Sequence, residues 1–283
     1  MSGAAGRPLG DVAVSFSGGL DTTLAVVQLL DVFERVHLLT YCNGYCFRIH
    51  AHHDRVRALR EAFGAERIVS RTEMVRSQID ELLEDYWKDL HRTGSPLIFD
   101  LACRFSMEVA TIQYCLENDI SHAADGLNSA QPVIFILEPD YIRMADAFMA
   151  EFGIQFLHPV YHFGDRGKRR ELLDRHGLNV EVKLISFVQR AGILPQISEQ
   201  ILTQPFCYAQ VPIFFLTSPL RHAPLLRRFG LATDDARAYR GERQRVAREL
   251  LARFVSELGG DLRELLDRRG APDDARDHFP DAL

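Results

Sequence analysis

A glycine turn near the N-terminus carries the residue types that bind an anion. Residues 17–23 read SGGLDTT and directly follow the apolar run DVAVSF at residues 11–16. Adjacent Gly18 and Gly19 let the backbone turn tightly and bring its N–H groups close to a ligand. A helix that begins at this turn points the positive end of its dipole at the same place. The segment therefore predicts a phosphate site, in which a magnesium ion or a hydrogen bond to the loop compensates the charge of Asp21.

The five cysteines are a second set of chemically useful side chains. Their odd number, in a chain of 283 residues, indicates free thiols in a reducing compartment rather than a disulfide framework. Cys103 immediately precedes a helix predicted from residue 105, and the dipole of such a helix would lower the pKa of the thiol. A lowered pKa suits a sulfur carrier or a metal ligand. Cys115 falls within the apolar stripe of the same helix, so we expect it in the core.

Strands that alternate with helices must position these side chains. Apolar runs predict strands at residues 11–16, 36–41, 67–70 and 120–124. Helical spacing of apolar residues predicts helices from residue 24 and at residues 53–63, 76–91, 105–118 and 141–152. This alternation is typical of an α/β protein whose parallel sheet carries helices on both faces. Cys42 and Cys46, at the end of the second strand, would then face the ligand crevice.

The charge balance bears on the partners of the chain. Its 33 Lys and Arg against 39 Asp and Glu give a net charge of −6. Proteins that wrap nucleic acid usually carry a basic surplus, so general nucleic-acid binding is disfavoured. No apolar run approaches the roughly 20 residues of a membrane span, and residues 1–9 show no secretory signal. These features predict a soluble, cytoplasmic protein.

Other charged or histidine-rich positions divide into structural and functional candidates. The histidines of HAHH at residues 50–53 fit the start of a helix better than a zinc site. The run KRR at residues 168–170 fits the solvated face of a helix. Arg104 and Arg143 lie near loops at the edge of the predicted sheet, so we expect them to contact phosphate or a substrate carboxylate.

The glycine turn resembles a known nucleotide-binding loop. SGGLDT is similar to the pyrophosphate loop of the PP-loop ATP pyrophosphatase superfamily. The resemblance implies a Rossmann-like (HUP-type) domain that cleaves magnesium-bound ATP between its α- and β-phosphates and adenylates a substrate oxygen, after which a nucleophile displaces AMP. It implies nucleotide contacts, with Asp21 also catalytic through the metal, from Ser15, Ser17, Gly18, Gly19, Asp21, Thr22, Thr23, Tyr41, Asp125, Gly126 and Asn128.

A second stretch resembles the sulfur-transferring branch of that superfamily. LACRFSME at residues 101–108 leads into a helix, and AADGLNSAQ follows at residues 123–131. In tRNA-thiolation enzymes, and in the enzymes that insert sulfur into the nickel-pincer cofactor, a Cys opens a helix and the next strand ends in a similar loop. The resemblance covers about residues 10–160 and implies that Cys103 handles sulfur.

The same resemblance implies a second, downstream thiol, which here is Cys207. A [4Fe-4S] cluster of the kind found in some members would be held by Cys103, Cys207 and either Cys42 or Cys46. The chain departs from the family pattern at Ser106, which stands where the second Cys of a CxxC pair is found. A persulfide without a cluster therefore stays open as the alternative.

Three regions follow from this interpretation. We expect a nucleotide-binding domain at residues 1–165, a mainly helical C-terminal region at residues 166–258 that closes over the substrate, and a disordered tail at residues 259–283. The composition changes at both boundaries, because residues 166–258 hold helical patterns around apolar pieces cut by prolines, and the tail is polar.

These features favour an ATP-dependent sulfur transferase that acts on a small molecule or a nucleotide, takes sulfur from sulfide or a donor, and forms a homo-oligomer. tRNA thiolation is an alternative within the same chemistry. An AMP-forming ligase that uses an amine, with structural cysteines, is an alternative chemistry. A regulatory module that binds nucleotides without catalysis is a third alternative, against which the intact Ser17, Gly18, Gly19 and Asp21 argue.

Overall fold

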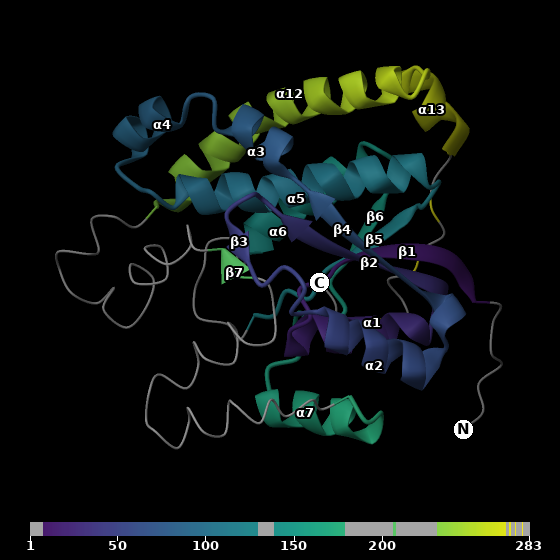
Figure 1. The fold of residues 1–283 in the computed structure, drawn as a ribbon. Helices are drawn as coiled ribbons and strands as arrows, with labels where there is room; N and C mark the ends of the chain where they lie inside the picture. The colour runs from purple at the N-terminus through teal and green to yellow at the C-terminus, as the bar shows by residue number, and fades with distance from the viewer. Residues whose placement is uncertain are drawn as a thin grey trace, which may run out of the picture.

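A parallel sheet is the centre of the fold. The computed structural model describes residues 8–129, 139–178, 206–207 and 231–269, together with residues 272, 275 and 279. Within these residues, five parallel strands form one sheet in the order β4-β2-β1-β5-β6. The strands are β1 (Leu9–Ser15), β2 (Phe33–Cys42), β4 (Ile68–Met74), β5 (His122–Ala124) and β6 (Gln155–Leu157). Helices cover both faces of the sheet (Figure 1), so the predicted α/β, Rossmann-like fold is confirmed.

The sequence of the inner strands explains their place in the sheet. Val12, Ala13 and Val14 of β1 are fully buried, and residues 36–42 of β2 are all buried. Strands covered on both faces are continuous apolar runs rather than alternating ones. Parallel pairing aligns their carboxyl ends, so the loops that follow β1, β2 and β5 meet at one edge of the sheet.

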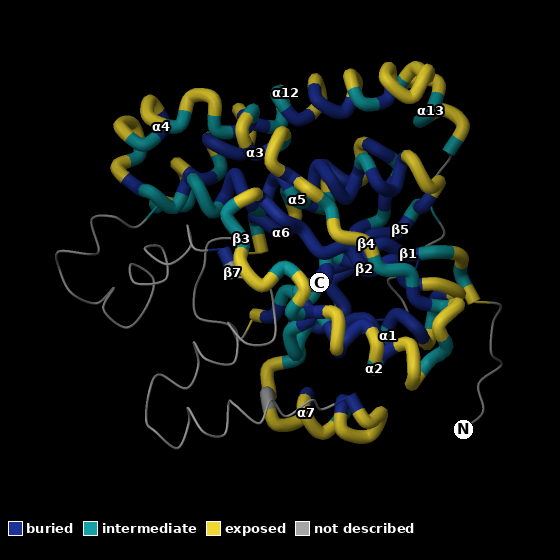
Figure 2. The backbone as a smooth tube through the Cα atoms, viewed as in Figure 1, coloured by how far each residue is buried: buried dark blue, intermediate teal, exposed yellow. Residues whose placement is uncertain are grey.

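Two apolar layers hold the helices against the sheet. One face carries α1 (Leu20–Leu30), α2 (His53–Phe63) and α7 (Arg166–Arg175), and the 3-10 turn η1 (Ala65–Arg67) leads from α2 into β4. The other face carries α3 (Arg76–Leu82), α5 (Ile98–Glu117), α6 (Pro139–Ala150) and α12 (Thr233–Glu257). Figure 2 shows the buried band between these layers. The region after residue 165 thus packs on both faces, α7 on α1 and α12 on α5.

A second, small sheet lies at the end of β2. β3 (Cys46–Phe47) pairs with β7 (Phe206–Cys207) in antiparallel fashion, with Cys46 opposite Cys207. Gly44, between β2 and β3, has φ +82°, a left-handed conformation that glycine adopts without steric cost. This pairing brings residue 207 to the carboxyl edge of the main sheet.

Helix α5 begins earlier than the helix predicted from residue 105. Ile98, Leu101 and Ala102 are buried and extend the apolar stripe of the helix backward. Cys103 therefore lies in the second turn of α5 and not at its start. This corrects the argument that the helix dipole lowers the pKa of its thiol.

The helix predicted at residues 76–91 is divided into α3 and α4 (Tyr86–Thr93). The break turns α4 so that Asp89 is buried in an ion pair with Arg243 of α12, while Trp87 is 78% exposed. A buried carboxylate needs such a partner, because burial without one is costly.

Residues 262–269 form α13 (Leu262–Arg269), where the polar composition led us to expect disorder. Its leucines pack against the apolar layer around α5, and Arg269 donates hydrogen bonds to the carbonyls of Cys115 and Ile120. These contacts stabilise residues 262–269 as a helix, although their polar composition alone does not predict one. Among the described helices, none is long and apolar enough to cross a membrane.

Candidate functional site

The glycine turn connects β1 to α1 and presents hydroxyl groups at the start of the helix. Gly18 has φ +81°, and the N–H of Gly19 donates to Oγ of Ser17 at 3.3 Å. The hydroxyls of Thr22 and Thr23 donate to the carbonyl of Gly19 at 3.2 and 2.7 Å. The first N–H groups of a helix have no partner within it, so this turn is suited to an anion.

The loop after β5 lies directly against this turn. A Cβ atom added to Gly126 would lie 2.7 Å from both the backbone nitrogen and Cα of Thr22, which is closer than any side chain could be placed. Only glycine allows this approach. The two sequence segments from which a nucleotide site was predicted are therefore brought together.

Asp21 forms an ion pair that the sequence analysis did not foresee. Nη1 of Arg169, on α7, lies 2.5 Å from its Oδ1. Residues 168–170 were expected to be a solvated face; Lys168 and Arg170 are exposed, but Arg169 is buried. Arg169 is four residues before the fully buried Leu173, so helical periodicity was the available signal.

Asp125 is held by protein groups on several sides. Its carboxylate lies 2.5 Å from Nη2 of Arg104 and 2.9 Å from Nδ1 of His158, and it accepts the N–H of Leu127 at 3.1 Å. Nε2 of His158 lies 2.9 Å from Asp146. This network fixes the loop that carries Gly126.

The pKa values of this network follow from its charges. Burial alone would raise the pKa of Asp125, but His158 and Arg104 together hold it below its usual value. Burial alone would lower the pKa of His158, but Asp125 and Asp146 raise it to about 9. His158 is therefore a cation at neutral pH, paired between two carboxylates.

Asn128 also contacts protein groups. Its Nδ2 donates to the carbonyls of Val160 and Phe163 at 2.9 and 2.7 Å, and the residue is fully buried. The side chain joins the loop after β5 to the loop after β6. Asp125 and Asn128, both expected at the nucleotide, thus hold the backbone around Gly126 in place.

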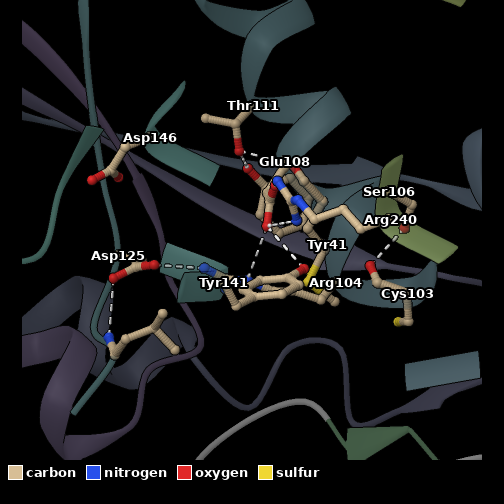
Figure 3. Close-up of polar contacts among 12 residues, drawn as sticks. Tyr41, Cys103, Arg104, Ser106, Glu108, Thr111, Asp125, Tyr141, Asp146 and Arg240 are labelled. Carbon is tan, nitrogen blue, oxygen red and sulfur yellow. Dashed lines mark hydrogen bonds and ion pairs between the residues drawn. The ribbon is translucent and has the colours of Figure 1, made fainter. Parts of the chain in front are cut away.

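Arg104 belongs to a second buried network, shown in Figure 3. Its Nε lies 3.7 Å from Oε1 of Glu108, and Arg240 of α12 lies 2.6 Å from Oε2 of the same residue. The guanidinium of Arg240 stacks on the ring of Tyr141, 4.4 Å from its centroid. Sequence reasoning missed the pair of Glu108 and Arg240, because these two residues are 132 positions apart in the chain.

The other predicted contacts lie apart from these networks. Arg143 is on the exposed side of α6, paired with Asp140. The hydroxyl of Tyr41 lies 2.6 Å from Oγ1 of Thr111 in the core. Burial raises the pKa of Tyr41 above its ordinary value, although hydrogen bonds with Thr111 and Ser15 oppose the shift. Ser15 and Tyr41 thus contact each other beside the turn.

Three thiols converge on one amide at the end of β2. Nδ2 of Asn43 lies 3.3 Å from Sγ of Cys103 and 3.3 Å from Sγ of Cys207. The thiol of Cys46 donates to Oδ1 of Asn43 at 3.2 Å. Both Cys103 and Cys207 sulfurs contact the same nitrogen, so at most twice 3.3 Å separates them. Of the strand pair, Cys46 and not Cys42 shares this amide.

The environment of these thiols differs from the one expected. Burial raises the pKa of Cys103 to about 12, so the thiol is protonated at neutral pH. Burial also raises the pKa of Cys115 to about 12, and this residue is fully buried in the core as predicted. Only Cys46 is partly exposed. Asn43, which joins the three sulfurs, gave no sequence signal beyond its place in a turn.

The carboxamide of Asn43 contacts each of the three sulfurs that were expected to hold a [4Fe-4S] cluster. Across the part of the chain that the structure describes, no group of three or more His, Cys, Asp or Glu is placed to hold a metal ion. The histidines at residues 50–53 lie at the start of a helix, as predicted, since α2 begins at His53, and burial lowers the pKa of His52 to about 4.

Comparisons with known proteins give little further information. No family model and no curated protein matches the chain. Among solved structures, it is similar to a predicted subunit of tRNA methyltransferase from Methanocaldococcus jannaschii, with 18% sequence identity and a TM-score of 0.38. The match covers 70% of this chain and 94% of that one. Similarity at this level does not define a function.

Proposed function

We propose that the chain is a PP-loop transferase that binds ATP at the glycine turn and transfers AMP to an oxygen of its substrate. The observation that carries the proposal is the contact between the two loops: SGGLDTT at the start of α1 meets Gly126 of the loop after β5. Each segment alone is a weak signal. Their contact at the carboxyl edge of a parallel sheet is the arrangement that binds nucleotides in open α/β folds.

The turn supplies donors for the phosphates. The N–H groups at the start of α1, with the hydroxyls of Ser17 and Thr22, would face the phosphate oxygens. Magnesium would bind at Asp21 and neutralise phosphate charge. Arg169 pairs with Asp21 and so compensates the negative charge of this carboxylate.

The reaction would then proceed in two balanced steps. The substrate oxygen attacks the α-phosphorus, and the bond to the β-phosphate breaks, so pyrophosphate leaves. A sulfur nucleophile next attacks the activated carbon, and AMP leaves with the oxygen. Preorganised N–H groups stabilise the charge that develops in the first step.

The thiol cluster supports sulfur as the nucleophile. Cys103 is next to Arg104, whose guanidinium contacts Asp125, and Asp125 is next to Gly126. The thiols and the glycine turn are therefore joined by a short, continuous path of contacts. In this proposal Cys103 or Cys207 carries the sulfur as a persulfide received from an external persulfide donor. Its outer sulfur attacks the activated carbon, and an external thiol then attacks the cysteine sulfur, so that the S–S bond breaks and the product leaves with the outer sulfur. The N–H groups of the Asn43 amide stabilise the charged sulfur.

Product analysis with ATP tests the nucleotide half of the proposal. Purified protein with magnesium and ATP should form AMP and pyrophosphate once the substrate is supplied; ADP as the product would contradict it. Gly126→Ala should lower ATP affinity by at least about tenfold, because the new methyl group pushes the loop from Thr22. Gly10→Ala is the matched control, since a Cβ atom there meets nothing within 4 Å. Equal ATP affinity of the two variants would contradict the proposal that ATP binds where Gly126 meets the glycine turn.

A further inference from the structure

Residues Cys46 and Cys207 lie directly opposite each other in the small antiparallel sheet. Opposite residues in such a pair have Cα atoms about 4.5–5.5 Å apart. Disulfides join residues whose Cα atoms are about 4.4–6.8 Å apart. The β3–β7 pairing therefore holds these two cysteines at a separation that a disulfide can span without movement of the backbone.

The side chains point to the same place. The thiol of Cys46 lies 3.2 Å from Oδ1 of Asn43, and the thiol of Cys207 lies 3.8 Å from the same oxygen. A hydrogen bond between the two thiols also contributes to the raised pKa of Cys46. Cys103 reaches only the other end of the amide, at Nδ2, and it comes from a helix and not from the paired strand.

Access to solvent distinguishes the two cysteines. Cys46 is partly exposed, next to Phe47 with 40% exposure, whereas Cys207 and Cys103 are buried. A sulfur-bearing reagent would reach Cys46 first. Cys207 is then in position to attack whatever sulfur becomes bound to Cys46.

We propose that Cys46 and Cys207 form a thiol–disulfide exchange site for disulfide reagents. The thiolate of Cys46 attacks a disulfide RSSR, which gives Cys46–S–S–R and releases one RS⁻. The thiolate of Cys207 then attacks Sγ of Cys46, which gives the Cys46–Cys207 disulfide and releases the second RS⁻. Two protein thiols are oxidised and one external disulfide is reduced to two thiols. This chemistry does not depend on the proposed transferase activity.

The site should react slowly at neutral pH and faster in base. Its neighbour Cys207 and burial raise the pKa of Cys46 well above that of an ordinary thiol. Because the thiolate is the nucleophile, the rate of the first step should rise about tenfold per pH unit below that pKa.

Oxidised glutathione is a direct probe of this proposal. Reduced, full-length protein is incubated with it, and disulfides are mapped by mass spectrometry of peptides made without reduction. The expected product is a Cys46–Cys207 link, with two glutathione molecules released for each protein. A Cys103–Cys207 link, or a glutathione adduct that persists in the wild type, would overturn the proposal.

Three variants assign the order of the steps. Cys207→Ser should retain glutathione on Cys46 as a stable adduct, while Cys46→Ser should react at least about tenfold more slowly. Cys103→Ser is the matched control and should still form the Cys46–Cys207 link. Should a variant fail to fold, the mapping of the wild type alone decides. None of these measurements uses ATP, so their failure is distinct from failure of the proposed function.

Discussion

Two aspartates at neighbouring strand ends show how differently motif residues can be used. Asp125, after β5, is 1% exposed and contacts Arg104, His158 and a backbone N–H group. Asp21, after β1, has an 18% exposed side chain and pairs with Arg169 from a helix outside the sheet. Asp125 helps to hold the loop after β5 in place at the carboxyl edge of the sheet. Asp21 is more accessible, so a ligand could bind beside Arg169 or take its place. Membership in a motif therefore does not show that a side chain touches the ligand.

Removal of the Asp125 charge should have the largest effect on stability. Asp125→Asn leaves Arg104 and His158 buried with less negative charge, and we expect a loss of about 3–5 kcal/mol in the free energy of unfolding. Urea unfolding measures this. Asp54→Asn, in an exposed pair with Arg57, is the control and should cost about 1 kcal/mol or less. Equal costs for both would contradict the scaffold role.

Asp21→Asn should separate function from stability. If Asp21 holds magnesium at the phosphates, we expect AMP formation to fall about 100-fold or more. The free energy of unfolding should fall by about 1–3 kcal/mol, less than for Asp125→Asn, because the buried Arg169 keeps a polar but uncharged partner. Arg169→Gln should affect the same site, and the exposed neighbour variant Lys168→Gln is its control. Full activity of Asp21→Asn would place the metal elsewhere.

The pH dependence of stability should report His158. Its pKa in the folded protein is about 9, above the ordinary value of 6.5, so the folded state binds the proton more tightly. The contribution of His158 to the free energy of unfolding is fully present below pH 6.5 and is lost as the pH rises through about 9. Wild-type stability should therefore fall over this range more steeply than that of His158→Gln. Parallel curves of urea midpoint against pH would show that the ion pairs of His158 are not significant.

The smallest effect on the chemistry of the thiols is expected at Cys115. Cys115→Ser places a hydroxyl in the apolar layer under α5 and should cost about 1–3 kcal/mol. Reaction with oxidised glutathione should be unchanged, because this thiol is fully buried and remote from the Asn43 amide. Altered mapping of the Cys46–Cys207 link in this variant would mean that Cys115 takes part in the exchange.

Local patterns were enough to predict much of the fold. The strand–turn–helix at residues 9–30 and helix α2 at His53–Phe63 follow from apolar spacing and from glycine, which act over a few residues. Short β6 was not predicted, whereas β5 of the same length was predicted from the apolar run at residues 120–124. The start of α5 was placed too late, although Ile98, Leu101 and Ala102 continue its apolar stripe toward the N-terminus.

The candidate site was predicted in its residue types but not in its contacts. The resemblance implied Cys103 and Cys207, with either Cys42 or Cys46 as the third thiol, and the sulfurs of Cys103, Cys207 and Cys46 do approach one another. Asn43 and Arg169 were not identified as site residues, because each depends on a partner from a distant part of the chain. Such pairs leave no periodic signal in a single sequence.

The long helix α12 has a consequence for how the chain is made. Arg240 and Arg243 reach back to Glu108 and Asp89, which leave the ribosome much earlier. Until residue 243 is synthesised, two carboxylates of the growing chain have no cationic partner from α12, and burying them alone is costly. The layer of helices around α5 should therefore stay open in the nascent protein and close only when α12, in the last fifth of the chain, has been synthesised. A chain that stops before Thr233 would contain the strands of the sheet and the glycine turn, but it would lack α12, which packs on α5.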